Sequence, residues 1–181
     1  SLLVILIGLT LNTFALSGGP DVYGYTWRDS NEPGGPVYHW IDIVGIPGAI
    51  DVKPLGDDNV LGPYQIGFPF HYYWYDVSQL WVGANGFIAF NNGNIAHPFP
   101  LIPSAANPND YIAAMASDLN FDGIGNTGLC WMWTNPALDT CIISWIGVPF
   151  WQSAAPTYSG SSSFQIILCK NDSSITFQYY S

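Results

Sequence analysis

The feature that most constrains this chain is the repeated interruption of short β-forming runs by turn residues. With 19 glycines and 14 prolines among 181 residues, no stretch after residue 20 keeps a helical apolar period for three uninterrupted turns. Runs rich in β-branched and aromatic residues recur instead, at 37–44, 64–70, 79–82, 86–90, 111–116, 129–134, 140–146, 163–169 and 174–180. This spacing predicts an all-β fold, an antiparallel β-sandwich of jelly-roll type with little or no helix after the N-terminal segment.

Alternation near the C-terminus predicts which side chains form the core. Phe164, Ile166 and Leu168 fall on one face of a strand, and Gln165 and Ile167 fall on the other. Residues 171–173 (NDS) are typical of a hairpin turn into the last strand, and the serine-rich stretch 159–163 is typical of a flexible loop.

Charge and hydrophobicity exclude several classes of protein. Thirteen acidic residues against three basic ones give a net charge of −10, so nucleic acid and anionic membrane surfaces are not expected partners. A hydrophobic content of 49% is too high for a disordered chain and is enough to bury a core. We expect one domain, over residues 18–181.

The ends of the sequence indicate an exported piece of a longer protein. Residues 1–16 are apolar and uncharged, and small turn-forming residues follow, which is typical of a signal peptide over residues 1–17. The run is shorter than the ~20 residues that span a bilayer, so we expect no transmembrane span in the mature chain. At the other end, the alternating pattern of residues 174–180 continues to the last position. These features predict a secreted or cell-surface fragment.

Three cysteines lie in the second half of the chain, and none belongs to a CxxC pair, so zinc is not expected. Cys130 and Cys141 flank the turn at 135–136, and a hairpin there would allow a disulfide between them in an oxidising compartment. Cys169 would then remain unpaired. The alternative is that all three are small buried hydrophobic residues in the reduced state.

An acidic loop at 118–126 is the sharpest candidate for a ligand site. Asp118, Asn120 and Asp122 alternate before a glycine, and such oxygen ligands can converge on calcium. The match to an EF-hand loop is partial, because the twelfth position is Leu129 instead of glutamate and no flanking helix is expected. The alternative is a solvated turn that favours these residues for backbone reasons. Calcium is the one cofactor that the sequence suggests.

No constellation of residues predicts catalysis. Glu32 is the only glutamate, so a pair of glutamates for glycoside hydrolysis is absent. His39, His71 and His97 are scattered, and no serine lies in a Gly-x-Ser-x-Gly motif. We therefore expect a protein that is not an enzyme.

Aromatic residues suggest a second kind of ligand. Trp74, Trp131 and Trp151 could stack on sugar rings, and a surface with few charges suits carbohydrate. Alternation in residues 131–133 (WMW) sends both tryptophans to one face, and the alternative is that this face is the core of the sandwich.

The order of segments from residue 63 onward resembles that of secreted bacterial β-sandwich modules and of nidogen-like (NIDO) extracellular domains. The segments that carry the resemblance are 63–70 (PYQIGFPF), 80–90 (LWVGANGFIAF), 109–119 (NDYIAAMASDL), 142–145 (IISW), 164–168 (FQIIL) and 175–179 (ITFQY). Upstream, 19–30 (GPDVYGYTWRDS) is similar to the entry of such modules in large surface proteins, many of them exported by the type IX route.

The resemblance implies a fold and a role but no catalytic residue. Its motifs are turn and packing signals, such as Asn85-Gly86. The chain departs from the pattern at Met115-Ala116, where an aromatic pair is usual, and at its three cysteines. The expected role is a non-catalytic adhesion or accessory module that binds an extracellular protein or a glycan. Alternatives are a carbohydrate-binding module and an accessory domain of a secreted peptidase.

Overall fold

The computed structural model describes residues 17–96 and 99–180, and the predicted signal segment 1–16 lies outside them. Contacts divide the chain into two compact units, residues 1–39 and residues 40–181. The expected single domain over residues 18–181 stays a prediction. In the first unit, β1 (Ser17–Gly18) pairs antiparallel with β2 (Trp27–Arg28). The carboxylate of Asp21 accepts hydrogen bonds from the N–H groups of Tyr23 and Tyr25, both at 2.9 Å, and these order the loop between the strands.

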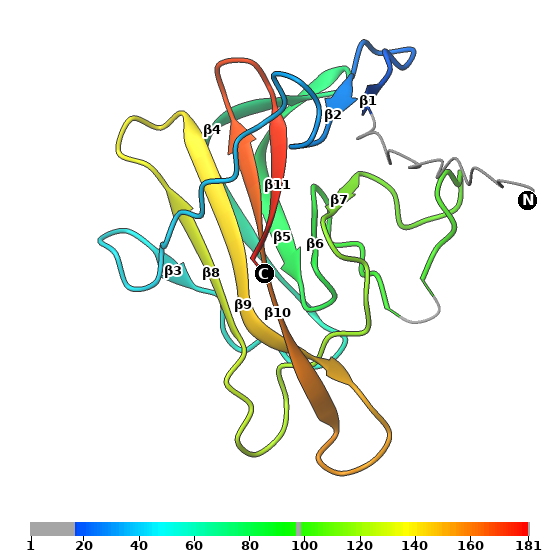
Figure 1. The fold of residues 1–181 in the computed structure, drawn as a ribbon, viewed down its shortest axis with the longest axis vertical. Coiled ribbons are helices and arrows are strands. Elements are labelled where there is room, and N and C mark those ends of the chain that lie inside the picture. The colour runs from blue at the N-terminus through cyan, green and yellow to red at the C-terminus, as the bar shows by residue number, and fades with distance from the viewer. Residues whose placement is uncertain (1–16, 97–98, 181) are drawn as a thin grey trace, which may run out of the picture. The chain divides into compact units, whose positions relative to one another are not determined.

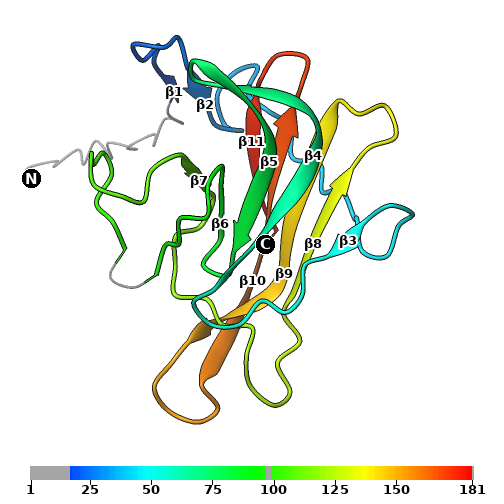
Figure 2. The same cartoon turned by 180° about the vertical axis from the view of Figure 1, so that it is seen from behind.

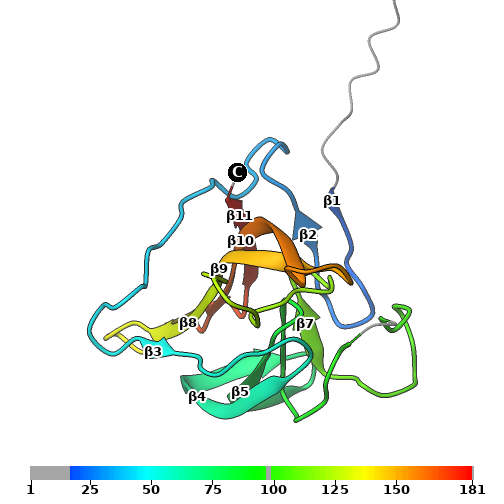
Figure 3. The same cartoon turned by 90° about the horizontal axis from the view of Figure 1, so that it is seen from below.

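The second unit is a two-layered antiparallel β-sandwich, as the sequence predicted, and the described residues contain no helix. Figure 3 shows the two sheets as separate layers. The five-stranded sheet, in front in Figure 1, has the order β11 (Ile175–Tyr180), β10 (Tyr158–Cys169), β9 (Thr140–Trp151), β8 (Leu129–Thr134) and β3 (Ile50–Asp51). The four-stranded sheet, in front in Figure 2, has the order β4 (Val60–Tyr72), β5 (Tyr75–Gly83), β6 (Phe87–Ala89) and β7 (Tyr111–Ala113).

The core lies between the sheets. A fully buried tryptophan in it connects the two layers. Trp145 on β9 stacks on Phe164 of β10, with ring centroids 5.1 Å apart. Its indole Nε1 donates to the carbonyl of Gly83 on β5, 3.1 Å away in the opposite sheet. Phe164, Ile166 and Leu168 are fully buried, which confirms the predicted core face of β10. A buried indole that bonds across the layers fixes how they pack as well as contributing apolar area.

The outer face of the five-stranded sheet differs from the prediction. Gln165, expected to face away from the core, does so but is fully buried, because residues 40–43 cross over it. Its side-chain amide donates to the carbonyl of Ile41 and its oxygen accepts from the N–H of Ile41. The expected strand at 37–44 is therefore absent, and a glutamine side chain replaces the backbone partner that a strand would have had.

The β10–β11 hairpin forms as predicted, with residues 170–173 in its turn. The serine-rich segment 159–163 is not a loop, because β10 already begins at Tyr158. It pairs with β9 through two register shifts, so the strand is irregular there but continuous.

The cysteines do not form the expected cross-strand pair. The β8–β9 hairpin is present, but its register places Cys130 opposite Trp145 and Cys141 opposite Thr134. All three cysteines are free thiols. Burial raises the pKa of Cys141 to about 12 and that of Cys130 well above its usual value, so both stay protonated and uncharged at neutral pH. They pack as small hydrophobic residues, which was the alternative interpretation.

Candidate functional site

An acidic corner forms where three loops of the second unit meet, at 53–59, 84–86 and 118–126. Asn85, in the turn between β5 and β6, is 1% exposed and holds the loops together. Its amide nitrogen donates to the carboxylate of Asp58 at 2.8 Å and to the carbonyl of Ile95 at 3.1 Å. Its amide oxygen accepts from the N–H of Leu119 at 2.8 Å. The sequence predicted a turn at Asn85-Gly86. The structure adds that the buried asparagine side chain joins the three loops by hydrogen bonds.

Asp57 is the most perturbed carboxylate of this corner. Burial, followed by the charges of Asp58, Asp118 and Asp122, raises the pKa of Asp57 from 3.8 to about 6. Its Oδ1 is buried without a hydrogen-bond partner among the described residues. Because the negative charges of three further aspartates act on Asp57, protonation of Asp57 lowers the repulsion between them.

Of the predicted calcium ligands Asp118, Asn120 and Asp122, Asn120 has a structural role. Its side-chain oxygen accepts from the N–H of Asp122 at 2.7 Å, and its nitrogen donates to the carbonyl of Thr157 at 3.0 Å. Within 17–96 and 99–180, no group of three or more His, Cys, Asp or Glu side chains is arranged to hold a metal ion. Calcium binding at this loop stays a prediction.

The three candidate stacking tryptophans are not brought together. Trp74 is 65% exposed in the β4–β5 turn, with its ring 5.9 Å from those of Tyr73 and Tyr75. Trp151 is 42% exposed at the end of β9, and Figure 2 shows this end and the β4–β5 turn at opposite ends of the second unit. A single flat platform for a sugar chain is therefore not formed by these residues.

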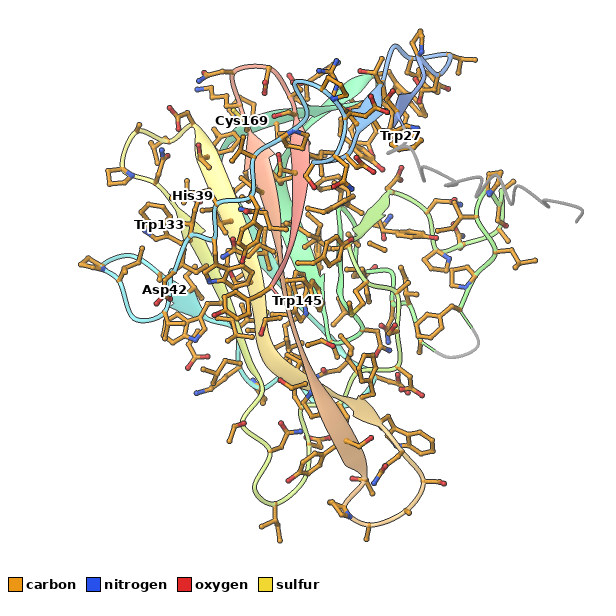
Figure 4. The ribbon with its side chains drawn as sticks, viewed as in Figure 1. Trp27, His39, Asp42, Trp133, Trp145 and Cys169 are labelled. Carbon is orange, nitrogen blue, oxygen red and sulfur yellow. The ribbon has the colours of Figure 1, made fainter. Side chains whose placement is uncertain are left out.

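Trp131 lies on the outer face of β8 and not in the core, so the packing alternative is wrong for residues 131–133. Met132 points inward and is 1% exposed, whereas Trp131 and Trp133 are half-buried on the other face. The Nε1 of Trp133 donates to the carbonyl of Pro47 at 3.2 Å, and Figure 4 shows Trp133 beside the segment that carries Asp42. The Nε1 of Trp131 is buried and has no partner among the described residues.

One of the described histidines, His71, pairs with an aspartate. His71 and Asp76 are register partners on β4 and β5, with Nδ1 and Oδ1 2.8 Å apart. Both side chains are more than half exposed, and no hydrogen bond joins a serine or cysteine to the pair among the residues that the structure describes. His97 lies outside those residues.

The match to known families coincides with the sandwich. A family model described as NIDO related matches residues 39–181, which include the whole of the second compact unit. This chain belongs to the NIDO-related family. No curated protein and no solved structure matches it. The resemblance inferred from the order of segments is thereby confirmed at the level of the family, whereas its bacterial type IX setting stays a prediction.

The NIDO-related module reveals two features that sequence reasoning missed. One is the acidic corner, in which Asp57 and Asp58 join the loop at 118–126 although about sixty residues separate them in the chain. The other is the crossing segment 40–43 over Gln165. Neither has a local sequence signal, because both depend on contacts between segments far apart in the chain. Among residues 17–96 and 99–180, no helix has the length and apolar character to cross a membrane.

Proposed function

We propose that this NIDO-related module is a non-catalytic adhesion or accessory part of a larger secreted or cell-surface protein. The observation that carries the proposal is the family match over residues 39–181. Two further features support it. The net charge of −10 favours solubility outside the cell. The largest fully buried side chains are apolar and form the packed core of the sandwich. An accessory domain of a secreted peptidase remains an alternative to this proposal.

The test is an assay of the purified full chain against peptide and glycan substrates. We expect no turnover. His71→Ala and Asp76→Ala are the informative variants, because these residues form a His–Asp pair. Hydrolysis by the unaltered chain that either substitution abolishes would contradict the proposal.

Carbohydrate binding is a second candidate, favoured by the exposure of Trp74 and Trp151. Because these residues lie at different ends of the sandwich, each would stack on a separate sugar. We therefore expect Trp74→Ala and Trp151→Ala to reduce binding on a glycan array independently, if the module binds glycans. An array without signal, or one that neither variant changes, would rule this candidate out.

A further inference from the structure

The outermost strand β11 presents an unpaired backbone edge. In the hairpin, the N–H of Cys169 donates to the carbonyl of Ser174 at 3.0 Å, and β10 and β11 then pair without a register shift. Hydrogen-bonded pairs alternate along an antiparallel ladder, so Thr176, Gln178 and Tyr180 bond to β10. The N–H and C=O groups of Ile175, Phe177 and Tyr179 therefore point away from β10, and no further strand of the described chain pairs with them.

Aromatic side chains lie beside this edge. Phe177 and Tyr179 are register partners of Ile166 and Phe164, which are fully buried, so their side chains point to the core side of the sheet. Because β11 is outermost, they remain 43% and 50% exposed. The strand also contains no proline, glycine or charged residue, the features with which edge strands usually avoid pairing.

We propose that the β11 edge is a strand-addition site that takes an extended segment of a partner polypeptide without acidic residues. Backbone groups at every second residue would bond to this segment, and its alternate apolar side chains would lie on Phe177 and Tyr179. The inference rests on the proposed role as a binding module and gives that role a surface and a class of partner.

Area and charge decide between a peptide and a second copy of this chain. With about 200 Å² for a whole aromatic side chain, the exposed parts of Phe177 and Tyr179 amount to roughly 200 Å². A stable dimer needs about 800 Å² from each partner, so these aromatic residues do not supply a dimer interface. Two copies would also bring together two net charges of −10, whereas a neutral or basic strand meets no such repulsion.

The experiment titrates the full chain with a synthetic peptide of alternating Val and Thr residues that has Lys at each end. NMR-detected hydrogen exchange should show the amides of Ile175, Phe177 and Tyr179 exchanging freely in the dilute chain and protected once the peptide is added. A matched peptide with N-methylated backbone amides should not bind, because it cannot form the ladder.

Two variants separate the backbone from the side chain. Phe177→Pro removes an outward N–H without removing a bond to β10, and Phe177→Ala removes the same aromatic ring but keeps the N–H. We expect Phe177→Pro to bind the peptide at least about tenfold more weakly than Phe177→Ala, provided both give native melting curves. Should Phe177→Pro fail to fold, the N-methylated peptide alone makes the comparison.

Four results would overturn the proposal: no binding of the Val/Thr peptide, equal binding of the N-methylated peptide, edge amides already protected in the dilute chain, or protection that rises with protein concentration alone. Protection already present in the dilute chain would mean that another segment of this chain covers the edge. Protection that rises with protein concentration would mean that a second copy covers it. None of them involves turnover, so the proposed non-catalytic role would be tested separately.

Discussion

The edge strands β4 and β11 differ in how readily a further strand could pair with them. β4 has thirteen residues and contains Pro63 and Pro69, which lack N–H groups, and its pairing with β5 shifts register twice. The carbonyl of Ile66 is also occupied, because it accepts a hydrogen bond of 2.7 Å from the hydroxyl of Thr134 on β8. β11 has six residues, an unshifted register and no proline.

The difference teaches that the two sides of the sandwich are not equivalent. At β4 the two sheets are closed on each other through the Thr134 hydroxyl, and a further strand meets prolines and an irregular backbone. At β11 the hydroxyl of Tyr179 also reaches the other layer, where it donates to the carbonyl of Ala114 at 2.6 Å, but the backbone edge is regular and contains no proline. Substitutions on β4 should therefore affect folding, and those on β11 should affect association more than folding.

The largest contrast is expected for two phenylalanines. Phe70 on β4 is fully buried and packs near Phe90, with ring centroids 6.4 Å apart. We expect Phe70→Ala to lower the free energy of unfolding by about 3–5 kcal/mol, because it leaves a cavity in the core. Phe177→Ala on β11, where the ring is 43% exposed, should cost about 1 kcal/mol. Denaturant unfolding of both variants measures the contrast, and equal losses would show that β11 is as tightly packed as β4.

A smaller effect is expected where β4 approaches β8. Gly67 has a φ of 94°, and a Cβ built on it would lie 2.8 Å from Cγ2 of Thr134. Gly67→Ala combines backbone strain with this overlap and should cost about 2–3 kcal/mol. The control is Gly45→Ala, whose φ is also positive at 67° but whose added Cβ meets nothing within 4 Å. Its cost should be about 1 kcal/mol, and an equal loss for both glycines would mean that the contact with Thr134 is unimportant.

These positions also show what the sequence could predict. Alternation identified the core face of β10, and turn residues located the β10–β11 hairpin, because both are local patterns. The burial of Gln165 could not be predicted, since it depends on a segment more than a hundred residues away. The effect of Asp118 on Asp57 also depends on segments far apart in the chain and could not be predicted. The prediction for Cys130 and Cys141 assumed the shortest hairpin turn, whereas the observed register places them opposite other residues.

The hydroxyl that closes the β4 side offers a more conservative test. Thr134→Val keeps the shape of the side chain but leaves the carbonyl of Ile66 without its donor, so we expect a loss of about 1 kcal/mol. Thr176→Val on β11 is the matched control, with no such bond to lose, and should be close to neutral. Thermal unfolding of the two variants decides. If Thr134→Val were equally neutral, the closed corner would not depend on this hydrogen bond.

The smallest effect concerns the carboxylates that precede the two edge strands, and it depends on pH. Asp57 lies before β4, and its pKa is raised from 3.8 to about 6, so its ionised form is disfavoured in the folded state. Asp57→Asn should therefore stabilise the fold at pH 7, by up to about 1 kcal/mol after screening by solvent is allowed for. The gain should shrink as the pH falls from 6 towards 4, because folded Asp57 takes up a proton in that window before the unfolded chain does.

Asp172, in the turn before β11, should behave in the opposite sense. Hydrogen bonds from the side chain and N–H of Ser174 lower the pKa of Asp172, so its ionised form is favoured in the folded state. Asp172→Asn should then reduce the melting temperature at pH 7, and the loss should disappear as the pH falls below 3.8 and through the lowered pKa of the folded state. Melting curves of Asp57→Asn at pH 7 and pH 4, and of Asp172→Asn at pH 7 and about pH 2, test both signs. A stabilisation by Asp57→Asn that is the same at both pH values would show that the charge of Asp57 is not its cause.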